Sequence, residues 1–209
     1  MLQWFFWIIP AHPVVSIAVG VYDKRSMGAL MSLHPGTLWW ITGLSGAGKT
    51  TVGRMLAARL RANGIAVIHL DGDELRCVMD ATDRLLPDER RALATQYARL
   101  CQLIVSQGVD VVCSTISLFR AVQEWNREHV HQYREVVLQV PMAVLRQRDS
   151  KGLYANAGTT NTGHVAGVQF EVEWPERPDI EIVNDGTRSI EQIVTDIISL
   201  DPRYQAAHS

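Results

Sequence analysis

A glycine-rich segment in the first quarter of the chain has the residue types needed to hold a phosphate chain. It fits the pattern G-x-x-x-x-G-K-[ST] and follows an apolar run. Glycines let consecutive backbone N–H groups turn inward around phosphate oxygens, and the N-terminus of a following helix attracts the same anion. The candidate phosphate-binding residues are Gly43, Leu44, Ser45, Gly46, Ala47, Gly48, Lys49, Thr50 and Thr51.

This segment predicts ATP and Mg²⁺ as cofactors. The Lys49 ammonium is expected to reach the β- and γ-phosphates, and the Thr50 hydroxyl to complete the Mg²⁺ coordination shell. The alternative is a glycine-rich turn that binds no ligand.

Two carboxylates, Asp71 and Asp73, follow the next apolar run. Open α/β sheets place their ligands at the carboxyl ends of the strands, so both side chains are expected at that edge. One carboxylate could order Mg²⁺ through water, with Asp71 as the metal candidate beside Thr50, and the other could take the proton of an acceptor hydroxyl. A simple turn is the alternative.

The third apolar run leads into a segment rich in hydroxyls, Ser114–Arg120. Its hydroxyl groups either cap the following helix or take part in catalysis. Arg120 is placed to bind an anion, and further cations follow at Arg146, Arg148 and Lys151. A kinase needs such cations to neutralise charge on the moving phosphoryl group, although a solvated basic surface is an equal alternative.

Short apolar runs alternate with longer amphipathic stretches from Leu38 onward, which predicts a parallel sheet wrapped by helices. The fold class is therefore α/β, a nucleotide-kinase-like three-layer sandwich with a five-stranded, mainly parallel sheet. Each strand is apolar enough to be buried on both faces. The expected strands are Leu38–Thr42, Ala66–Leu70, Asp110–Ser114, Val136–Val140 and Ile180–Val183.

Four helices are expected between and after these strands. The first ends at Asn63-Gly64, and the last begins at Ser189 with Gln192 in a capping-box spacing and an isoleucine-rich stripe that packs on the sheet. The first three ranges are Thr50–Ala62, Pro87–Gln107 and Arg120–His131. Residues 150–178 show no period and are expected to form a lid.

Composition limits the function classes. The chain has 209 residues, which suits one α/β domain over residues 36–209, and a net charge of −2, which provides no positive field for nucleic acid. Cys77, Cys101 and Cys113 show no paired spacing, so we expect reduced thiols and a cytoplasmic protein. Leu2–Tyr22 carries no charge but is interrupted by Pro10 and Pro13, which favours an unstructured or non-native leader over residues 1–35 rather than a membrane anchor.

From about Leu38 to Leu200 the chain resembles the adenylylsulfate kinases, P-loop enzymes that transfer the γ-phosphate of ATP to the ribose 3′-hydroxyl of adenylylsulfate. Lys-Gly-Leu-Tyr after Arg-Asp is the distinctive part of the match. The segments that carry the resemblance are Trp40–Thr51, Leu70–Asp73 with Arg76, Ile116-Ser117 with Phe119-Arg120, Arg148-Asp149 with Lys151–Tyr154, and Pro175-Glu176 with Pro178-Asp179.

The resemblance implies roles for individual residues. Lys49, Asp71, Asp73 and Ser117 would be catalytic, Ser117 matching a serine described as phosphorylated in the family. Direct in-line transfer needs positioning and charge stabilisation, so an obligatory phosphoenzyme is not expected. The residues implied to bind the substrate are Arg76, Arg90, Arg120 and the lid residue Lys151. The family also forms dimers, so a homodimer is expected.

The departures from the family pattern lie on the acceptor side. Aliphatic residues at both aromatic clamp positions would replace stacking on the base by weaker apolar contact, so the acceptor can differ. A cytidine diphosphate derivative is the second candidate. The departures are Leu85-Leu86 for Phe-Ser, Leu93–Gln96 for Asn-Ile-Arg-Arg, Val165–Gln169 for Phe-Thr-Gly-Ile-Asp, and Leu118 for Pro.

Two other functions compete with phosphoryl transfer. A nucleotide-dependent switch of the GTPase type needs Asn-Lys-x-Asp, which does not occur in the sequence. A non-catalytic binding homologue is opposed by the intact Lys49, Thr50, Asp71 and Asp73, although the altered acceptor side keeps it open.

Overall fold

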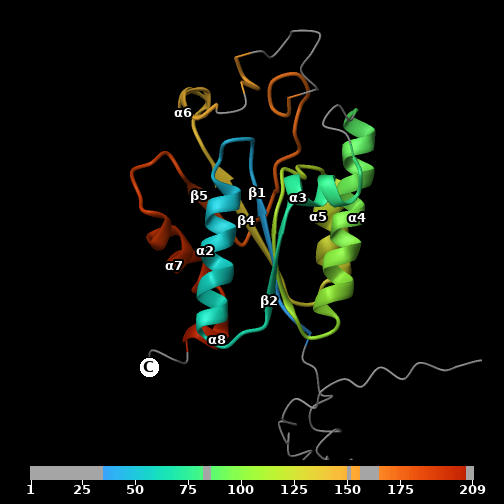
Figure 1. Ribbon diagram of the computed structural model, residues 1–209, viewed down its shortest axis with the longest axis vertical. Coiled ribbons are helices and arrows are strands. Elements are labelled where there is room, and N and C mark those ends of the chain that lie inside the picture. Colours follow the sequence, from blue (N-terminus) through green and yellow to red (C-terminus); the bar gives the residue numbers. More distant parts are fainter. Residues whose placement is uncertain (1–34, 82–85, 150–151, 156–164, 206–209) are drawn as a thin grey trace, which may run out of the picture. The chain divides into compact units, whose positions relative to one another are not determined.

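The computed structural model describes residues 35–81, 86–149, 152–155 and 165–205. The expected leader therefore lies outside the described residues, apart from its last position. Five parallel strands form one sheet in the order β2-β3-β1-β4-β5 (Figure 1). The strands are β1 Leu38–Thr42, β2 Val67–Asp71, β3 Asp110–Ser114, β4 Tyr133–Gln139 and β5 Ile180–Val183.

Helices cover both faces of the sheet and confirm the three-layer α/β fold. The described helices are α2 Lys49–Ala62, α3 Gly72–Val78, α4 Pro87–Val105, α5 Arg120–His129, α6 Met142–Gln147, α7 Ile190–Ile198 and α8 Pro202–Gln205. Figure 1 shows α2 and α7 on one side of the sheet and α4 and α5 on the other. Every strand pairing is parallel, as expected for strands joined by crossover helices.

The central strand β1 supplies side chains to both hydrophobic cores. Trp39 and Ile41 pack in the core that contains residues of α2 and α7, whereas Leu38 and Trp40 pack in the core that contains residues of α4 and α5. Side chains alternate along a strand, so a fully apolar run is what a strand covered on both faces requires.

A glycine after α2 and a capping box before α7 fix the end of the first helix and the start of the second, as expected. Gly64 follows α2 with φ of +77°, a left-handed conformation that glycine adopts without steric cost. At α7, the Ser189 hydroxyl accepts from the Gln192 N–H at 3.3 Å, and the Gln192 side chain accepts from the Ser189 N–H at 3.0 Å. The capping box at Ser189 is therefore confirmed.

The structure corrects two expectations about the strands. β2 is shifted by one residue to end at Asp71, and β4 begins three residues earlier than predicted, at Tyr133. Burial on both faces holds for β1 and β3 but is wrong for β2 and β5, where Ile68 is 40% and Val183 is 51% exposed. These are the two edge strands, and the helices do not cover the edges of the sheet completely.

Three helices, α3, α6 and α8, were not expected from the sequence. Each has seven residues or fewer, which is too short for an apolar period to be visible. Between residues 150 and 178, the described part contains no helix or strand, only an isolated bridge between Ala166 and Phe170. Among the described residues, no helix combines the length and apolar character that crossing a bilayer demands.

Candidate functional site

The glycine-rich loop connects β1 to α2 and depends on glycine at two close contacts. A Cβ atom at Gly43 would lie 2.4 Å from the Leu138 carbonyl oxygen, and one at Gly48 would lie 2.6 Å from the Asn184 side-chain nitrogen. That nitrogen donates to the Ala47 carbonyl at 2.9 Å, which holds the loop against the residue that follows β5. The close packing of neighbouring strands therefore fixes the shape of the loop.

Lys49 and Thr50, the first residues of α2, project their polar groups toward the loop and the sheet edge. The Lys49 Nζ donates to the Leu44 carbonyl at 2.8 Å, across the loop. The Thr50 hydroxyl donates to Asp71 Oδ2 at 2.6 Å. This hydrogen bond joins the loop after β1 to the end of β2.

Side chains from β2 and β3 support the first residue of α2 from the side of the sheet. The Ser114 hydroxyl donates to the Lys49 carbonyl at 3.1 Å, and His69 Nε2 lies 3.1 Å from the same hydroxyl. Burial lowers the pKa of His69, although the nearby Asp71 carboxylate opposes the shift. His69 is therefore neutral at neutral pH and can accept from or donate to Ser114 without adding charge below the loop.

The two predicted carboxylates have different surroundings. Asp71 is buried, and besides the Thr50 hydroxyl it accepts the Asp73 N–H at 2.9 Å, which makes it the N-cap of α3. Asp73 lies in the first turn of that helix, is more exposed, and forms an ion pair with Arg76. Asp71 is thus held rigidly beside Thr50, while Asp73 faces the neighbouring pocket residue Arg76.

The hydroxyl-rich segment after β3 does not cap α5. The N-cap of that helix is Phe119, and no side chain makes a capping hydrogen bond there. Instead, Thr115 and Ser117 share a hydrogen bond of 2.7 Å, and both are buried. The Thr42 hydroxyl donates to the Ile116 carbonyl at 2.7 Å. Of the two alternatives for these hydroxyls, the cap is therefore excluded.

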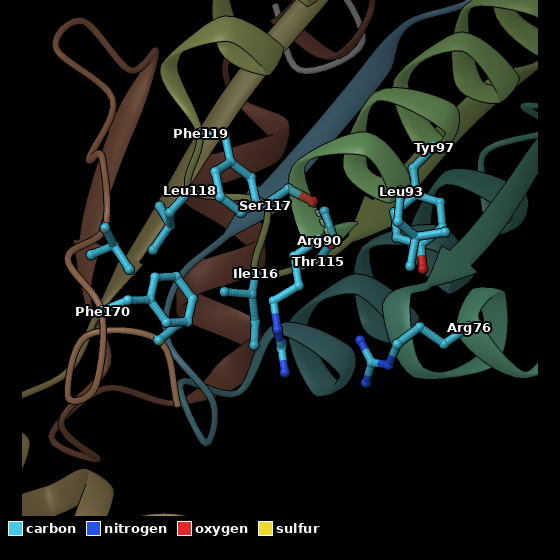
Figure 2. Close-up of a pocket in the computed structure, with 12 residues that line it drawn as sticks. Arg76, Arg90, Leu93, Tyr97, Thr115, Ile116, Ser117, Leu118, Phe119 and Phe170 are labelled. Atoms are coloured by element: carbon cyan, nitrogen blue, oxygen red, sulfur yellow. Dashed lines mark hydrogen bonds between the residues drawn. The ribbon is translucent and has the colours of Figure 1, made fainter. Parts of the chain in front are cut away.

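A pocket opens beside the carboxyl ends of β2 and β3, between α3, α4 and the loop after β3 (Figure 2). Figure 2 shows Arg76 and Arg90, from two different helices, extending their guanidinium groups toward the same open side. Two positive charges beside an apolar wall suit a ligand with an anionic group and a flat or apolar part. The lining residues are Arg76, Arg90, Leu93, Tyr97, Thr115, Ile116, Ser117, Leu118, Phe119, Ala166, Phe170 and Val172.

Two of the other predicted cations, Arg120 and Arg148, are not part of the lining of this pocket. Arg120 lines an adjacent groove, pairs with Glu176, and donates its backbone N–H to the Glu173 carboxylate at 2.6 Å. Arg148 donates to the Asn184 carbonyl at 2.8 Å, behind the glycine-rich loop. Lys151 lies outside the described residues. Substrate binding by Arg120 and Lys151 remains a prediction.

Part of the expected lid packs directly on the site. Ala166 lies in a small core with Leu44 of the glycine-rich loop and with Leu118, and the partly buried Phe170 packs against it. The Glu173 N–H donates to the Leu118 carbonyl at 3.0 Å. Residues 165–174 therefore pack against the loop after β3, beside the pocket, and their action as a lid remains a prediction.

Sequence analysis missed several pocket residues. Of the two clamp positions expected to be aliphatic, Leu85 lies outside the described residues and Val165 is buried, while Phe119 and Phe170 add aromatic rings to the pocket lining. Tyr97 and Leu93 of α4 were also not predicted as site residues. The departure at Leu93 from the family pattern was the one signal that pointed to this part of α4.

The oxygen ligands available for a metal are few. Among the residues the structure describes, no cluster of three or more His, Cys, Asp or Glu side chains is arranged to hold an ion. Thr50 and Asp71 provide a hydroxyl and a carboxylate 2.6 Å apart. This oxygen pair suits Mg²⁺, which is usually held by one or two protein groups and completes its shell with water and substrate phosphates.

Comparison with known proteins places this site in a family. The model for the family described as adenylylsulphate kinase matches residues 35–183. The cytidine diphosphoramidate kinase of Campylobacter jejuni is 37% identical over 161 residues, with 76% of this chain and 92% of the relative covered. The adenylyl-sulfate kinase of Paraburkholderia xenovorans is 36% identical over 156 residues, with 74% of this chain and 87% of the relative covered.

The solved structures agree with these relatives. The Mycobacterium tuberculosis APS kinase CysC, in complex with AMPPNP and APS, superposes with a TM-score of 0.73 at 28% identity, with 79% of this chain and 97% of that chain covered. The intact glycine-rich loop, the two carboxylates and the arginine pocket all lie at the carboxyl ends of neighbouring strands, β1, β2 and β3. The chain belongs to the adenylylsulphate kinase family and is a kinase that transfers phosphate to a hydroxyl group.

Proposed function

We propose that the protein transfers the γ-phosphate of ATP to a hydroxyl group of a nucleotide-linked anion. The first candidate reaction is phosphorylation of adenylyl sulfate at its 3′-hydroxyl, the step that completes sulfate activation. The observation that carries the proposal is the Thr50–Asp71 hydrogen bond of 2.6 Å, which joins the glycine-rich loop to the edge where the arginine pocket opens.

On the donor side, the loop and Lys49 would hold the triphosphate. The Lys49 ammonium now donates to a loop carbonyl, and it would exchange that partner for the β- and γ-phosphate oxygens. Mg²⁺ bound at Thr50 and Asp71 would neutralise charge on the same phosphates. The complex of the M. tuberculosis relative with AMPPNP, an ATP analogue, supports ATP as the donor.

On the acceptor side, Arg76 and Arg90 would hold the anionic part of the acceptor. Asp73 is the better candidate for the group that receives the hydroxyl proton, because Asp71 already binds Thr50 and the α3 backbone. Loop residues Thr115 and Ser117 lie in the same pocket lining and would contact the acceptor near the transfer site.

A cytidine diphosphate derivative is the second candidate acceptor. It is supported by the 37% identity to the cytidine diphosphoramidate kinase of C. jejuni and by Leu86 and Leu93, which depart from the adenylylsulfate kinase pattern on the acceptor side. Two nucleotide acceptors that both carry an anion can use the same arginine pair, so the base and its neighbours would decide between them.

The test is to incubate the purified protein with ATP, Mg²⁺ and either adenylyl sulfate or cytidine diphosphoramidate, and to identify products by mass spectrometry. Lys49→Ala is the control and should lower the transfer rate about 10²- to 10³-fold, because it removes a charge that stabilises the transition state. Phosphorylated adenylyl sulfate supports the first candidate, and a phosphorylated cytidine compound supports the second. If neither acceptor is phosphorylated, the proposed function is rejected.

The remaining expectations concern the environment of the protein. We propose a cytoplasmic enzyme, where ATP is available, that acts on small molecules and not on nucleic acid. We also propose a homodimer, since two-fold symmetric dimers are the commonest assembly. Light scattering coupled to gel filtration would measure the mass in solution, and a monomer at all concentrations would contradict the dimer.

A further inference from the structure

The Tyr97 hydroxyl of α4 is buried in the acceptor pocket without a hydrogen-bond partner. The residue is 2% exposed and lines the pocket together with Arg76 and Arg90. Its hydroxyl is one of a small number of buried side-chain polar groups without a partner among the described residues. The others, on Trp39, Trp40 and Asn126, belong to residues outside the pocket lining.

The ring of Tyr97 is held in place by the fold, while its oxygen faces the pocket. The residue belongs to the buried core on the α4 side of the sheet. Figure 2 shows the hydroxyl at the end of the ring that lies toward Arg76. Such a buried polar group costs free energy unless a partner compensates it, so its position at a ligand pocket needs an explanation.

The chemical state of this hydroxyl suits a hydrogen-bond donor. Burial raises the pKa of Tyr97 to about 12, although the Arg76 guanidinium opposes the shift. The phenol is therefore protonated at neutral pH and can donate to an anionic oxygen, which gives a stronger hydrogen bond than a neutral acceptor does.

A departure in the sequence points to the same helix face. Leu93 stands where the adenylylsulfate kinase pattern has Asn, and it precedes Tyr97 by one helical turn. Residues four apart lie on the same side of a helix, and both residues line the pocket. The polar group that is missing at residue 93 is thus available one turn later.

We propose that Tyr97 is an acceptor-binding residue, whose hydroxyl donates a hydrogen bond to an anionic phosphate oxygen of the acceptor held by Arg76 and Arg90. The proposal rests on the proposed function, since it assumes that this pocket binds the acceptor. The ATP site uses other residues, so Tyr97 would affect acceptor binding alone.

The test is Tyr97→Phe, which removes only the oxygen and keeps the ring. Steady-state kinetics with adenylyl sulfate and with cytidine diphosphoramidate should show KM for the acceptor raised about 10- to 100-fold, since a hydrogen bond to a charged group is lost. KM for ATP should stay within about twofold. The melting temperature of the free protein should not fall, because the hydroxyl has no partner to lose.

Tyr133→Phe is the matched control. Tyr133 is also buried, but its hydroxyl donates to Glu135 at 2.9 Å, away from the pocket. This variant should lower the melting temperature and leave KM for the acceptor unchanged. The proposal therefore predicts that Tyr97→Phe changes the acceptor KM and not the melting temperature, whereas Tyr133→Phe changes the melting temperature and not the acceptor KM.

The outcomes separate this proposal from the proposed function. An active wild-type protein whose acceptor KM is unchanged in Tyr97→Phe overturns the role of Tyr97 and leaves the proposed function standing. A lower melting temperature with an unchanged acceptor KM also overturns it, because it shows a purely structural hydroxyl. A wild-type protein that phosphorylates neither acceptor overturns both.

Discussion

Asp71 is the residue on which both halves of the site converge. Its carboxylate accepts from the Thr50 hydroxyl on the donor side and from the Asp73 N–H at the start of α3. Its backbone belongs to two elements at once, because it is the last residue of β2 and the N-cap of α3. In the proposed reaction, the same position would let its carboxylate hold a metal bound to the triphosphate.

Replacing Asp71 by Asn separates its charge from its hydrogen bonds. The amide oxygen can still accept from Thr50 or Asp73, so the melting temperature should change little. The charge that would hold Mg²⁺ is lost, and kcat should fall about 10²- to 10³-fold. Coupled-enzyme kinetics would measure this, with the exposed Glu74→Gln on α3 as control. Wild-type rates in Asp71→Asn would remove the residue from the metal site.

Ser117 tests whether the reaction passes through a phosphorylated enzyme. Its hydroxyl is buried and bonded to Thr115 at 2.7 Å. We expect Ser117→Ala to keep transfer within about tenfold of wild type, because in-line transfer needs positioning and charge, not a covalent relay. Labelling with γ-³²P-ATP would measure any phosphoprotein. Loss of all activity, together with a labelled serine in the wild type, would contradict direct transfer.

At the residue scale, the sequence predicts those site residues that lie together in one short segment. The glycine-rich loop, Lys49, Thr50 and the two carboxylates could be identified because each lies within one short, recognisable segment. Tyr97 and Phe170 could not, because they reach the pocket only when α4 and residues 165–174 pack beside the loop after β3. No short stretch of sequence contains that long-range packing.

At the scale of elements, α2 depends on a close approach to the sheet. A Cβ atom at Gly53 would lie 2.2 Å from Ser114 Oγ and 2.7 Å from His69 Nε2. Those two side chains support the Lys49 carbonyl at the start of α2. The packing of the helix and the shape of the phosphate-binding loop are thus linked through one glycine.

Gly53→Ala should therefore lower the free energy of unfolding by about 1 to 2 kcal/mol. Overpacking and the loss of the Ser114 hydrogen bonds cost more than the gain in helix propensity of alanine. Urea unfolding would measure the change. Arg54→Ala, next to it on the exposed face, is the control and should change stability by less than about 0.5 kcal/mol. A stabilised Gly53→Ala protein would show that the contact is loose.

The elements that sequence predicted best are those with several turns or a continuous apolar run. α2, α4, β1 and β3 were found within about two residues at each end. α3 was missed because Asp71 ends a strand and caps a helix at once, so Asp-Gly-Asp resembles a turn. Burial of the edge strands was overestimated because composition does not reveal the order of strands in a sheet.

At the scale of the whole molecule, Arg203 connects the C-terminal helix α8 to the amino ends of the central strands. Its guanidinium lies 2.7 Å from Asp110 Oδ2 at the start of β3 and 3.0 Å from the Thr37 hydroxyl before β1. It also pairs with Asp201, and both aspartates are almost fully buried. This connection lies at the sheet end opposite to the glycine-rich loop.

Arg203→Met should lower the free energy of unfolding by about 2 kcal/mol, because it leaves two buried carboxylates without their cation. The loss should be less than for a fully buried pair, since Arg203 is partly exposed and water can screen the charges. Arg188→Met, which breaks an exposed pair with Asp196, is the matched control in the same urea titration. Equal stabilities for the two variants would contradict a connecting role for Arg203.

The central claim is that a triphosphate held at Lys49 and Thr50 passes its terminal phosphate to a hydroxyl on a small nucleotide. Phosphorus NMR of the protein with ATP, Mg²⁺ and the two candidate acceptors follows that phosphate directly. The account predicts that the γ-phosphate signal is replaced by a phosphate monoester signal, with ADP formed in equal amount and only when an acceptor is present. Release of inorganic phosphate alone, or an unchanged ATP spectrum, would contradict it.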